Sequence, residues 1–440
     1  MKKFLARILG FPAIALRKWQ VITEKLVMRV LFMGLLALIS LALTNLFDRW
    51  LPEALATYVS GDAVDTLLSI IANAMLAVTT FSLTVMVTVY RSSSNQFTPR
   101  VHRLIMRDKT TQNTLAAFIG AYVFALTAVI MRELNIFTDD RAALLFMMTV
   151  FVLIYVVISM VRWVLHLQEF GSLMKTSRQL EEMTQQHFDS RLANACLGAN
   201  PWDGEIPDDA TAICANETGY VQQIYQDSLN SNAGDSNLEI YMTADIGSFV
   251  LRGDPVAHVV CKDCDLDDEL EEMIRDHVSI GDMRIYDQDP RFGLIALGEI
   301  ASKALSPGVN DPGTAIDILT RQVRILVNYI DTSNSGEDEE NKITHENLHV
   351  RPLAAEDLIM DALGAWSRDG AAIIEVQIRM QKSLDQLIRN ATSEMADAAK
   401  SFAQTSYDRA FEAMTFAPDI ARLNDAASDK IKTREPEKTT

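Results

Sequence analysis

The side chains best placed to do chemistry lie on one face of a long apolar segment. Thr66–Tyr90 holds no charged residue, yet polar and small residues recur in it at steps of three and four, the spacing of one helix face. Hydroxyl and amide groups aligned in this way can contact ions or water along a helix. The stripe consists of Asn73, Ala77, Thr80, Thr84 and Thr88, and Arg91 and Asn95 continue it.

Two interpretations of this stripe stay open. In the first, the threonines bond to carbonyls four residues earlier and the face packs against neighbouring helices. In the second, the segment lines a pore. Four helices from one chain cannot enclose a wide water path, so such a pore requires several copies of the chain. Arg91, repeated around the pore axis, would then form a cationic ring that favours anions.

A second group of polar residues lies in a turn. Ser306, Asn310, Asp311 and Thr314 cluster where an Asp-Pro pair opens a helix. Helix capping by Asp311 and the turn chemistry of the preceding Ser-Pro pair explain the group structurally. Contact with a ligand or a neighbouring subunit is the functional alternative.

No catalytic, cofactor or metal site is expected. His258, Cys261 and Cys264 have the spacing of three metal ligands, but no fourth ligand follows at a suitable distance in the chain. Phosphate-binding glycine loops, HExxH, GxSxG and kinase-type lysine motifs are absent from the sequence. Enzymatic activity is therefore not favoured.

Four charge-free runs in the first 165 residues indicate an integral membrane protein. Each run holds 18 to 25 residues. At about 1.5 Å per residue, each can cross a bilayer core of about 30 Å as a helix. The runs are Val30–Phe47, Thr66–Tyr90, Thr110–Met131 and Ala142–Val161.

Basic residues set the expected orientation of these spans. Twelve of them precede the first run or fall between the second and third, whereas three occupy the other two loops. This asymmetry predicts that both termini are cytoplasmic in a bacterial inner membrane. Within the third run, Ala116-Ala117 and Gly120-Ala121 form a small-residue pattern that is typical of a helix-packing seam.

The rest of the chain is strongly acidic. Residues 1–165 carry a net charge of +7 and the whole chain −18, so residues 166–440 carry −25. A domain of that charge repels nucleic acid, which argues against DNA or RNA as a partner. The domain is large enough for a core of its own, and its four cysteines are expected to stay reduced, without disulfides.

The expected fold is a transmembrane domain of four α-helices followed by a cytoplasmic α+β domain. Residues 1–29 form an amphipathic interfacial segment, 30–165 the transmembrane domain, and 166–264 a helical connector with a small β-rich lobe. A helical hairpin region at 265–330, an acidic flexible loop at 331–349, C-terminal helices at 350–420 and a disordered tail at 421–440 complete the chain.

The β-rich lobe resembles a small barrel. GYVQQI followed by GSFVLRGDPV is similar to the strand pattern of biotinyl and lipoyl modules, in which short strands meet at glycine turns. Those carriers hold their cofactor on a lysine at a hairpin tip, and no lysine lies between Thr218 and Val260. The lobe is therefore expected to be a barrel-like scaffold rather than a cofactor carrier.

Two longer motifs carry a family resemblance. TTFSLTVMVTVYRSSSNQFTPRVHRLIMRDKTTQNTLAAFIGAYVFAL and DPRFGLIALGEIASKALSPGVNDPGTAID resemble the bacterial predicted membrane protein family known as domain of unknown function 2254, from about Leu31 to Met414. Ile295 stands where that family usually has a basic residue, and Glu299 where aspartate is usual. The resemblance implies a membrane topology and no established activity.

The function expected from these features is a homo-oligomeric channel or transporter whose path is lined by the second span. The alternative is a membrane-tethered regulatory or scaffold protein that binds a cytoplasmic partner of unknown identity. The lipid bilayer and further copies of the chain are the expected partners.

Overall fold

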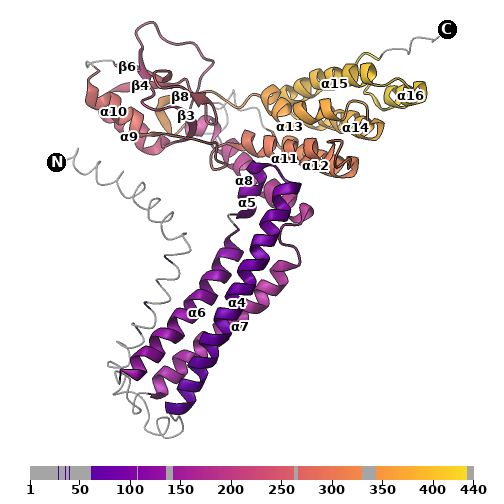
Figure 1. Cartoon of the computed structure of the whole chain (residues 1–440). Helices are drawn as coiled ribbons and strands as arrows, with labels where there is room; N and C mark the ends of the chain where they lie inside the picture. Colours follow the sequence, from indigo (N-terminus) through magenta and orange to yellow (C-terminus); the bar gives the residue numbers. More distant parts are fainter. Residues whose placement is uncertain are drawn as a thin grey trace. The chain divides into compact units, whose positions relative to one another are not determined.

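The computed structural model describes residues 61–106, 108–134, 142–261, 266–329 and 343–433, together with Met28, Leu35 and Ile39. The chain forms two compact units, Met1–Lys175 and Thr176–Thr440 (Figure 1).

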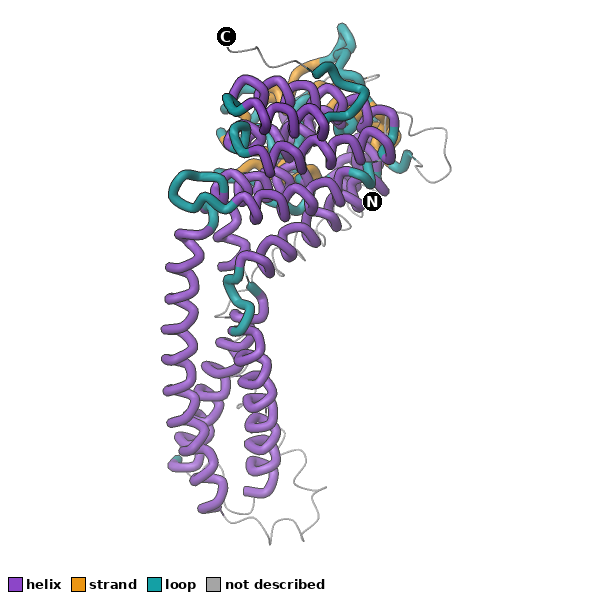
Figure 2. The backbone as a smooth tube through the Cα atoms, turned by 90° about the vertical axis from the view of Figure 1, so that its right-hand side faces the viewer, coloured by secondary structure: helices purple, strands orange, loops and turns teal. Residues whose placement is uncertain are grey.

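Long helices build the first unit. α4 (Gly61–Gln96), α6 (Lys109–Glu133) and α7 (Ala142–Leu167) lie side by side, and the short α5 (Pro99–Met106) connects α4 to α6 (Figures 1 and 2). Asp108 begins α6 by accepting a hydrogen bond of 2.7 Å from the backbone N–H of Thr111. The core between the helices contains Val64, Leu68, Ile71 and Met75 of α4, Phe118, Phe124 and Ala125 of α6, and Leu145, Val152 and Trp163 of α7.

Among the described residues of this unit, three helical stretches are long and apolar enough to cross a membrane. They are Gly61–Gln96, Pro99–Glu133 and Leu145–Leu167. The second, third and fourth spans expected from the sequence fall largely within them. The first expected span, Val30–Phe47, lies outside the described residues apart from Leu35 and Ile39.

The central helix α6 confirms the small-residue packing seam. Ala116, Ala117, Gly120 and Ala121 are all buried. Small side chains let helix backbones approach closely, which is how membrane helices gain packing energy in lipid.

The second unit begins with a lobe built on two sheets. A mixed sheet has the order β1-β8-β4-β6-β2, in which β8 runs parallel to both of its neighbours, and a smaller antiparallel sheet has the order β5-β3-β7. The helices α9 (Gln226–Asp235) and α10 (Asp268–Asp276) pack against this lobe. The strands are β1 (Ala199–Pro201), β2 (Thr211–Cys214), β3 (Gly219–Ile224), β4 (Leu238–Met242), β5 (Phe249–Val250), β6 (Pro255–Cys261), β7 (Val278–Gly281) and β8 (His345–Val350).

Two expectations for this lobe need correction. The described strands form open sheets with free edges rather than a closed barrel, so the barrel-like lobe is not confirmed. Residues 218–261 do contain strands, as their β-rich pattern predicts. The strand β8, however, comes from far along the chain and joins the sheet between β1 and β4. Cys261 is disulfide-bonded, whereas Cys196 and Cys214 are free, so the expectation of no disulfide is wrong at Cys261.

Helices make up the rest of the second unit. α11 (Pro290–Ala304) and α12 (Pro312–Leu326) each begin at an Asp-Pro pair and pack against each other. Asp289 accepts a hydrogen bond from the N–H of Phe292, and Asp311 accepts one from the N–H of Thr314, both at 3.0 Å. The other helices are α8 (Leu173–Ala193), η2 (Ala195–Gly198), α13 (Ala355–Asp369), α14 (Ile374–Asn390), α15 (Ser393–Ala413) and α16 (Ala417–Ala426), the last of which reaches into the segment expected to be a disordered tail.

Candidate functional site

The polar stripe on α4 faces away from the helix core. At 100° per residue, its members lie about 180° around the helix from the buried residues Val64, Leu68, Ile71 and Met75. All of them are exposed, so neither α6 nor α7 covers this face. We refer to the exposed set as the α4 stripe, which consists of Asn73, Ala77, Thr80, Thr84, Thr88 and Arg91.

The threonines of the α4 stripe satisfy their hydroxyl groups within the helix. Each hydroxyl donates 2.9 Å hydrogen bonds to the carbonyl four residues earlier, from Thr80 to Leu76, Thr84 to Thr80 and Thr88 to Thr84. This removes most of the cost of placing a hydroxyl in an apolar medium. The stripe can therefore face a partner helix or water without rearrangement of its own hydrogen bonds.

Arg91 lies at the end of this stripe. It is exposed, and within the described part of the chain it forms no hydrogen bond or ion pair. Near it, Ser93 is buried and its hydroxyl lies 2.9 Å from Nδ1 of His102. The sequence prediction placed Arg91 on the stripe, and the structure leaves its guanidinium available.

A group of rings and ionisable residues at the same end of the bundle was missed from the sequence. Nε2 of His166 lies 2.9 Å from Oδ2 of Asp108, with both side chains largely buried. The rings of Trp163, His166 and Phe170 contact one another, and the His166 centroid lies 5.9 Å from that of Trp163 and 5.1 Å from that of Phe170. Asp108 lies just before the third charge-free run and His166 follows the fourth, so the sequence placed both ionisable residues at ends of expected spans. Because Asp108 also caps α6, the pair has a structural role.

The turn around Asp311 is occupied by capping interactions. Asp311 accepts hydrogen bonds from the backbone N–H and the hydroxyl of Thr314, at 3.0 and 2.6 Å. These bonds hold the pKa of Asp311 below its ordinary value, and the bond from the Thr314 hydroxyl contributes most. Ser306 donates to the carbonyl of Lys303 at 2.6 Å, and Asn310 is exposed with a φ of 50°. Ser306, Asp311 and Thr314 are half-buried, and of the four residues Asn310 is the exposed one.

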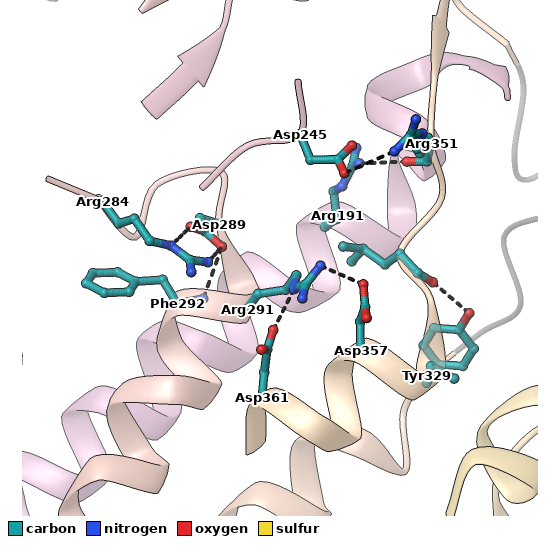
Figure 3. Close-up of polar contacts among 12 residues, drawn as sticks. Arg191, Asp245, Arg284, Asp289, Arg291, Phe292, Tyr329, Arg351, Asp357 and Asp361 are labelled. Carbon is teal, nitrogen blue, oxygen red and sulfur yellow. Dashed lines mark hydrogen bonds and ion pairs between the residues drawn. The ribbon is translucent and has the colours of Figure 1, made fainter. Parts of the chain in front are cut away.

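A cluster of arginines and aspartates joins the sheet lobe to the helices of the second unit (Figure 3). Arg284 donates to both carboxylate oxygens of Asp289, at 2.8 and 2.9 Å, and its guanidinium lies 5.3 Å from the centre of the Phe292 ring. Burial raises the pKa of Asp289, and hydrogen bonding to Arg284 opposes that rise. The buried carboxylate thus caps α11 and anchors the loop before it.

Arg291 makes the second paired contact of this cluster. Its Nε donates to Asp361 at 2.5 Å and its Nη1 donates to Asp357 at 2.8 Å. The two carboxylates lie one turn apart on α13, so a single guanidinium clamps α11 to α13. Burial lowers the pKa of Arg291, but the two carboxylates outweigh it and leave that pKa above its ordinary value.

Arg191, Asp245 and Arg351 complete the cluster with looser contacts. Nη2 of Arg191 lies 3.4 Å from the carbonyl oxygen of Arg351, and Nη1 of Arg351 lies 3.9 Å from Oδ2 of Asp245. Burial lowers the pKa of Arg191 and raises that of Asp245. These residues come from α8, the β4–β5 loop and the segment after β8, and no sequence spacing links them.

Other polar groups offer weaker candidates. An open groove of about 890 Å³ runs along α15 beside Lys430–Thr433, and the Gln404 side chain bonds to the backbone N–H and carbonyl of Lys432 there. Its lining mixes three lysines with two aspartates, so it favours no single ligand charge. No cluster of three His, Cys, Asp or Glu side chains suited to a metal occurs among the described residues.

Comparison with known proteins places the chain in a family. Uncharacterized proteins of Mycobacterium tuberculosis and Mycobacterium bovis are 28% identical to it over 270 residues. That alignment covers 59% of this chain and 51% of each relative, so the chain spans about half the length of the curated relatives it matches. No solved structure matches. Residues 23–386 match the family described as predicted membrane protein (DUF2254), and the chain belongs to that family.

Proposed function

We propose that this protein is a homo-oligomeric channel or transporter of the bacterial inner membrane, with α4 lining the path. The observation that carries the proposal is the α4 stripe, in which Asn73, three threonines and Arg91 recur on one exposed face of a membrane-length helix, opposite its buried face. Polar groups in membrane helices face protein or water rather than lipid. Further copies of the chain around a common axis would give the stripe that environment.

Arg91 adds a charge preference to this proposal. Its exposed guanidinium has no partner in the described part of the chain and continues the stripe beyond Thr88. Repeated in each copy, it forms a ring of positive charge at one mouth of the path, which attracts anions and repels cations. Anions are therefore the proposed cargo.

The expected membrane arrangement belongs to the same proposal. Val30–Phe47 is a fourth span, both termini are cytoplasmic, and the acidic residues 166–440 form the cytoplasmic domain. The division of that domain into a connector with a β-rich lobe, a hairpin region and C-terminal helices stays part of the proposal.

A membrane-tethered regulatory or scaffold protein is the second candidate function. The hydrogen bonds of Thr80, Thr84 and Thr88 to their own helix are compatible with it, because a stripe with satisfied hydroxyl groups can pack in a dry interface. The exposed turn with Val309 and Asn310 would then be a contact for a cytoplasmic partner or a neighbouring subunit.

Cysteine scanning of α4 separates the two functions. Single cysteines replace Thr80, Thr84 and Thr88, with Phe81 and Val85 as controls off the stripe, in a background in which Cys214, Cys261 and Cys264 are serine. Water-exposed thiolates react quickly with a charged thiol reagent, whereas lipid-facing or packed thiols do not. The channel requires fast labelling at the three threonines and slow labelling at the controls, with altered anion flux for Thr84→Cys. Uniform protection along the stripe would exclude a wet path and favour the scaffold.

A further inference from the structure

Among the described residues, no ion pair links Arg191 to a carboxylate, and one nitrogen of its guanidinium is buried without a partner. Its Nη1 is buried and has no hydrogen-bond partner, and its Nη2 makes one long contact of 3.4 Å with a backbone carbonyl. Within the described residues, no Asp or Glu lies within ion-pair distance of it. An ionised group in this position loses its hydration without the compensation that a paired charge receives.

Two other arginines of the same cluster are fully paired with carboxylates. Arg284 and Arg291 each make two charge-assisted hydrogen bonds to aspartates at 2.5 to 2.9 Å. Arg351 does not, because its closest carboxylate, that of Asp245, lies 3.9 Å away. The cluster therefore contains two guanidiniums, Arg191 and Arg351, for which the one nearby carboxylate is too distant for a hydrogen bond.

Arg351 is also held in a fixed position. Its guanidinium lies over the ring of Trp202, 5.0 Å from the ring centre, and Nη2 would lie 3.5 Å from a Cβ at Gly204. Stacking on an aromatic face orients a guanidinium while leaving its N–H groups free to donate in the plane. The side chains of Arg351 and Asp245 are 43% and 48% exposed. A ligand from solvent would therefore reach the three residues Arg191, Asp245 and Arg351 from the side of Arg351 and Asp245.

We propose that a phosphate-bearing ligand binds between Arg191 and Arg351, in the place that the carboxylate of Asp245 now borders. A phosphate group has enough acceptor oxygens to accept hydrogen bonds from both guanidiniums. The planar guanidinium of arginine matches phosphate geometry, because it can donate two parallel N–H hydrogen bonds. Asp245 competes with the ligand, because its negative charge lies beside the same two cations (Figure 3). This site is independent of the α4 path.

The electrostatic surroundings support that competition. Partial burial raises the pKa of Asp245, and Arg351, Arg291 and Arg191 lower it in that order while Asp357 raises it. Asp245 thus lies in the field of three guanidiniums, one of which is already neutralised by Asp357 and Asp361. Once Asp245 turns outward, the positive charge that is left lies on Arg191 and Arg351.

Binding measurements on the full-length protein in detergent test the site. Inorganic phosphate and AMP are titrated separately by calorimetry, and the melting temperature is followed in parallel. Arg191→Met removes the guanidinium whose Nη1 is unpartnered, Asp245→Asn removes the competing charge at nearly constant shape, and Arg252→Met is the control because it is an exposed arginine of the same unit.

The proposal requires opposite effects from the two site variants. Arg191→Met should weaken phosphate binding by about tenfold or more, and Asp245→Asn should tighten it by about threefold or more, while Arg252→Met leaves it unchanged. Equal affinity for the two probes identifies free phosphate as the ligand, and tighter binding of AMP identifies a phosphomonoester. Absence of binding to the unmodified protein overturns the site.

A structural role for Asp245 predicts the reverse pattern. If Asp245 is a permanent counter-ion of the two arginines, Asp245→Asn lowers the melting temperature and does not tighten phosphate binding. That result would overturn the proposal even if Arg191→Met fails to fold.

Discussion

Arg321 and Glu181 form an ion pair that ties α12 to α8 in the interior of the second unit. Nη1 of Arg321 donates to Oε2 of Glu181 at 2.5 Å, and the two side chains are 7% and 9% exposed. Asp317 accepts from Nε of the same guanidinium at 2.7 Å, and Arg324 donates to the other oxygen of Glu181 at 2.7 Å. Every charged group in this network thus has a partner, in contrast to Arg191.

Removal of one member of the buried pair is expected to destabilise the second unit strongly. Glu181→Ala leaves the Arg321 guanidinium with Asp317 alone, and breaking a buried pair in this way costs about 3–5 kcal/mol. Arg324→Met is the matched control, because its side chain is 63% exposed and a pair of that kind contributes about 0–1 kcal/mol. Thermal and denaturant unfolding of the two variants measure the difference. Equal losses would show that the burial of Arg321 does not matter.

Gly293 is expected to tolerate no side chain, because α8 and α11 are in close contact there. A Cβ at Gly293 would lie 2.2 Å from Oγ1 of Thr184. Gly293→Ala should therefore lower the free energy of unfolding by about 1–3 kcal/mol, whereas Gly308→Ala, with nothing within 4 Å, should change it little. The double variant Gly293→Ala with Thr184→Ala should recover part of the loss. Additive effects of the two changes would contradict this contact.

Local patterns in the sequence explain which parts of this fold could be predicted. Charge-free runs longer than a bilayer core and Asp-Pro helix starts depend on neighbouring residues, so α4, α6, α7, α11 and α12 were all foreseeable. The insertion of β8 between β1 and β4 depends on strand pairing across more than a hundred residues, which no local pattern encodes. The sequence pattern therefore could not show that β8 joins this sheet, and the expected barrel is not what the strands form.

The same distinction applies to the candidate sites. The α4 stripe and the turn at Asp311 each lie on one continuous segment, where helical spacing and capping chemistry could be recognised. Arg191, Asp245 and Arg351 come from three separate segments, and their meeting depends on how the sheet lobe packs on the helices. The unpartnered Nη1 of Arg191 can be recognised only when the residues around it in the fold are known.

Asp311 is expected to contribute to stability as a helix cap, and its contribution should depend on pH. Asp311→Ala should cost about 1 kcal/mol, and Asp282→Ala, an exposed aspartate of the same unit, should cost little. Because hydrogen bonds hold the pKa of Asp311 below the ordinary 3.8, its stabilisation is present above that value and is lost as the pH falls through the folded-state pKa.

An asparagine at this position isolates the titration. Asp311→Asn keeps an N-cap acceptor without a carboxyl group, so between about pH 5 and pH 3 it should lose less stability than the unmodified protein. If Asp311 instead contacts a neighbouring subunit, Asp311→Ala will reduce assembly, measured by size-exclusion chromatography with light scattering, with little change in melting.

Cys196 is expected to be inert in the folded protein. Burial raises the pKa of its thiol to about 11, and the nearby Arg191 charge opposes that rise only in part. Thiolate is the reactive form, so a charged maleimide at neutral pH should label Cys196 slowly in a variant with Cys214, Cys261 and Cys264 replaced by serine, and quickly after unfolding. Labelling of the folded variant at the rate of a free surface cysteine would show that the region around η2 opens in solution.

Reporter fusions test the proposed orientation. A reporter fused after Met174 or at the C-terminus should be cytoplasmic, and one inserted near Ala56 should lie outside, because twelve basic residues lie on one side of the expected spans and three on the other. The disulfide at Cys261 bears on the same question, because disulfides persist mainly in oxidising compartments and the cytoplasm is reducing. A periplasmic C-terminus would place the acidic domain outside the cytoplasm and account for that disulfide. A cytoplasmic C-terminus would uphold the proposed topology, and thiol titration of Cys261 in freshly lysed cells would then report how much of it is reduced.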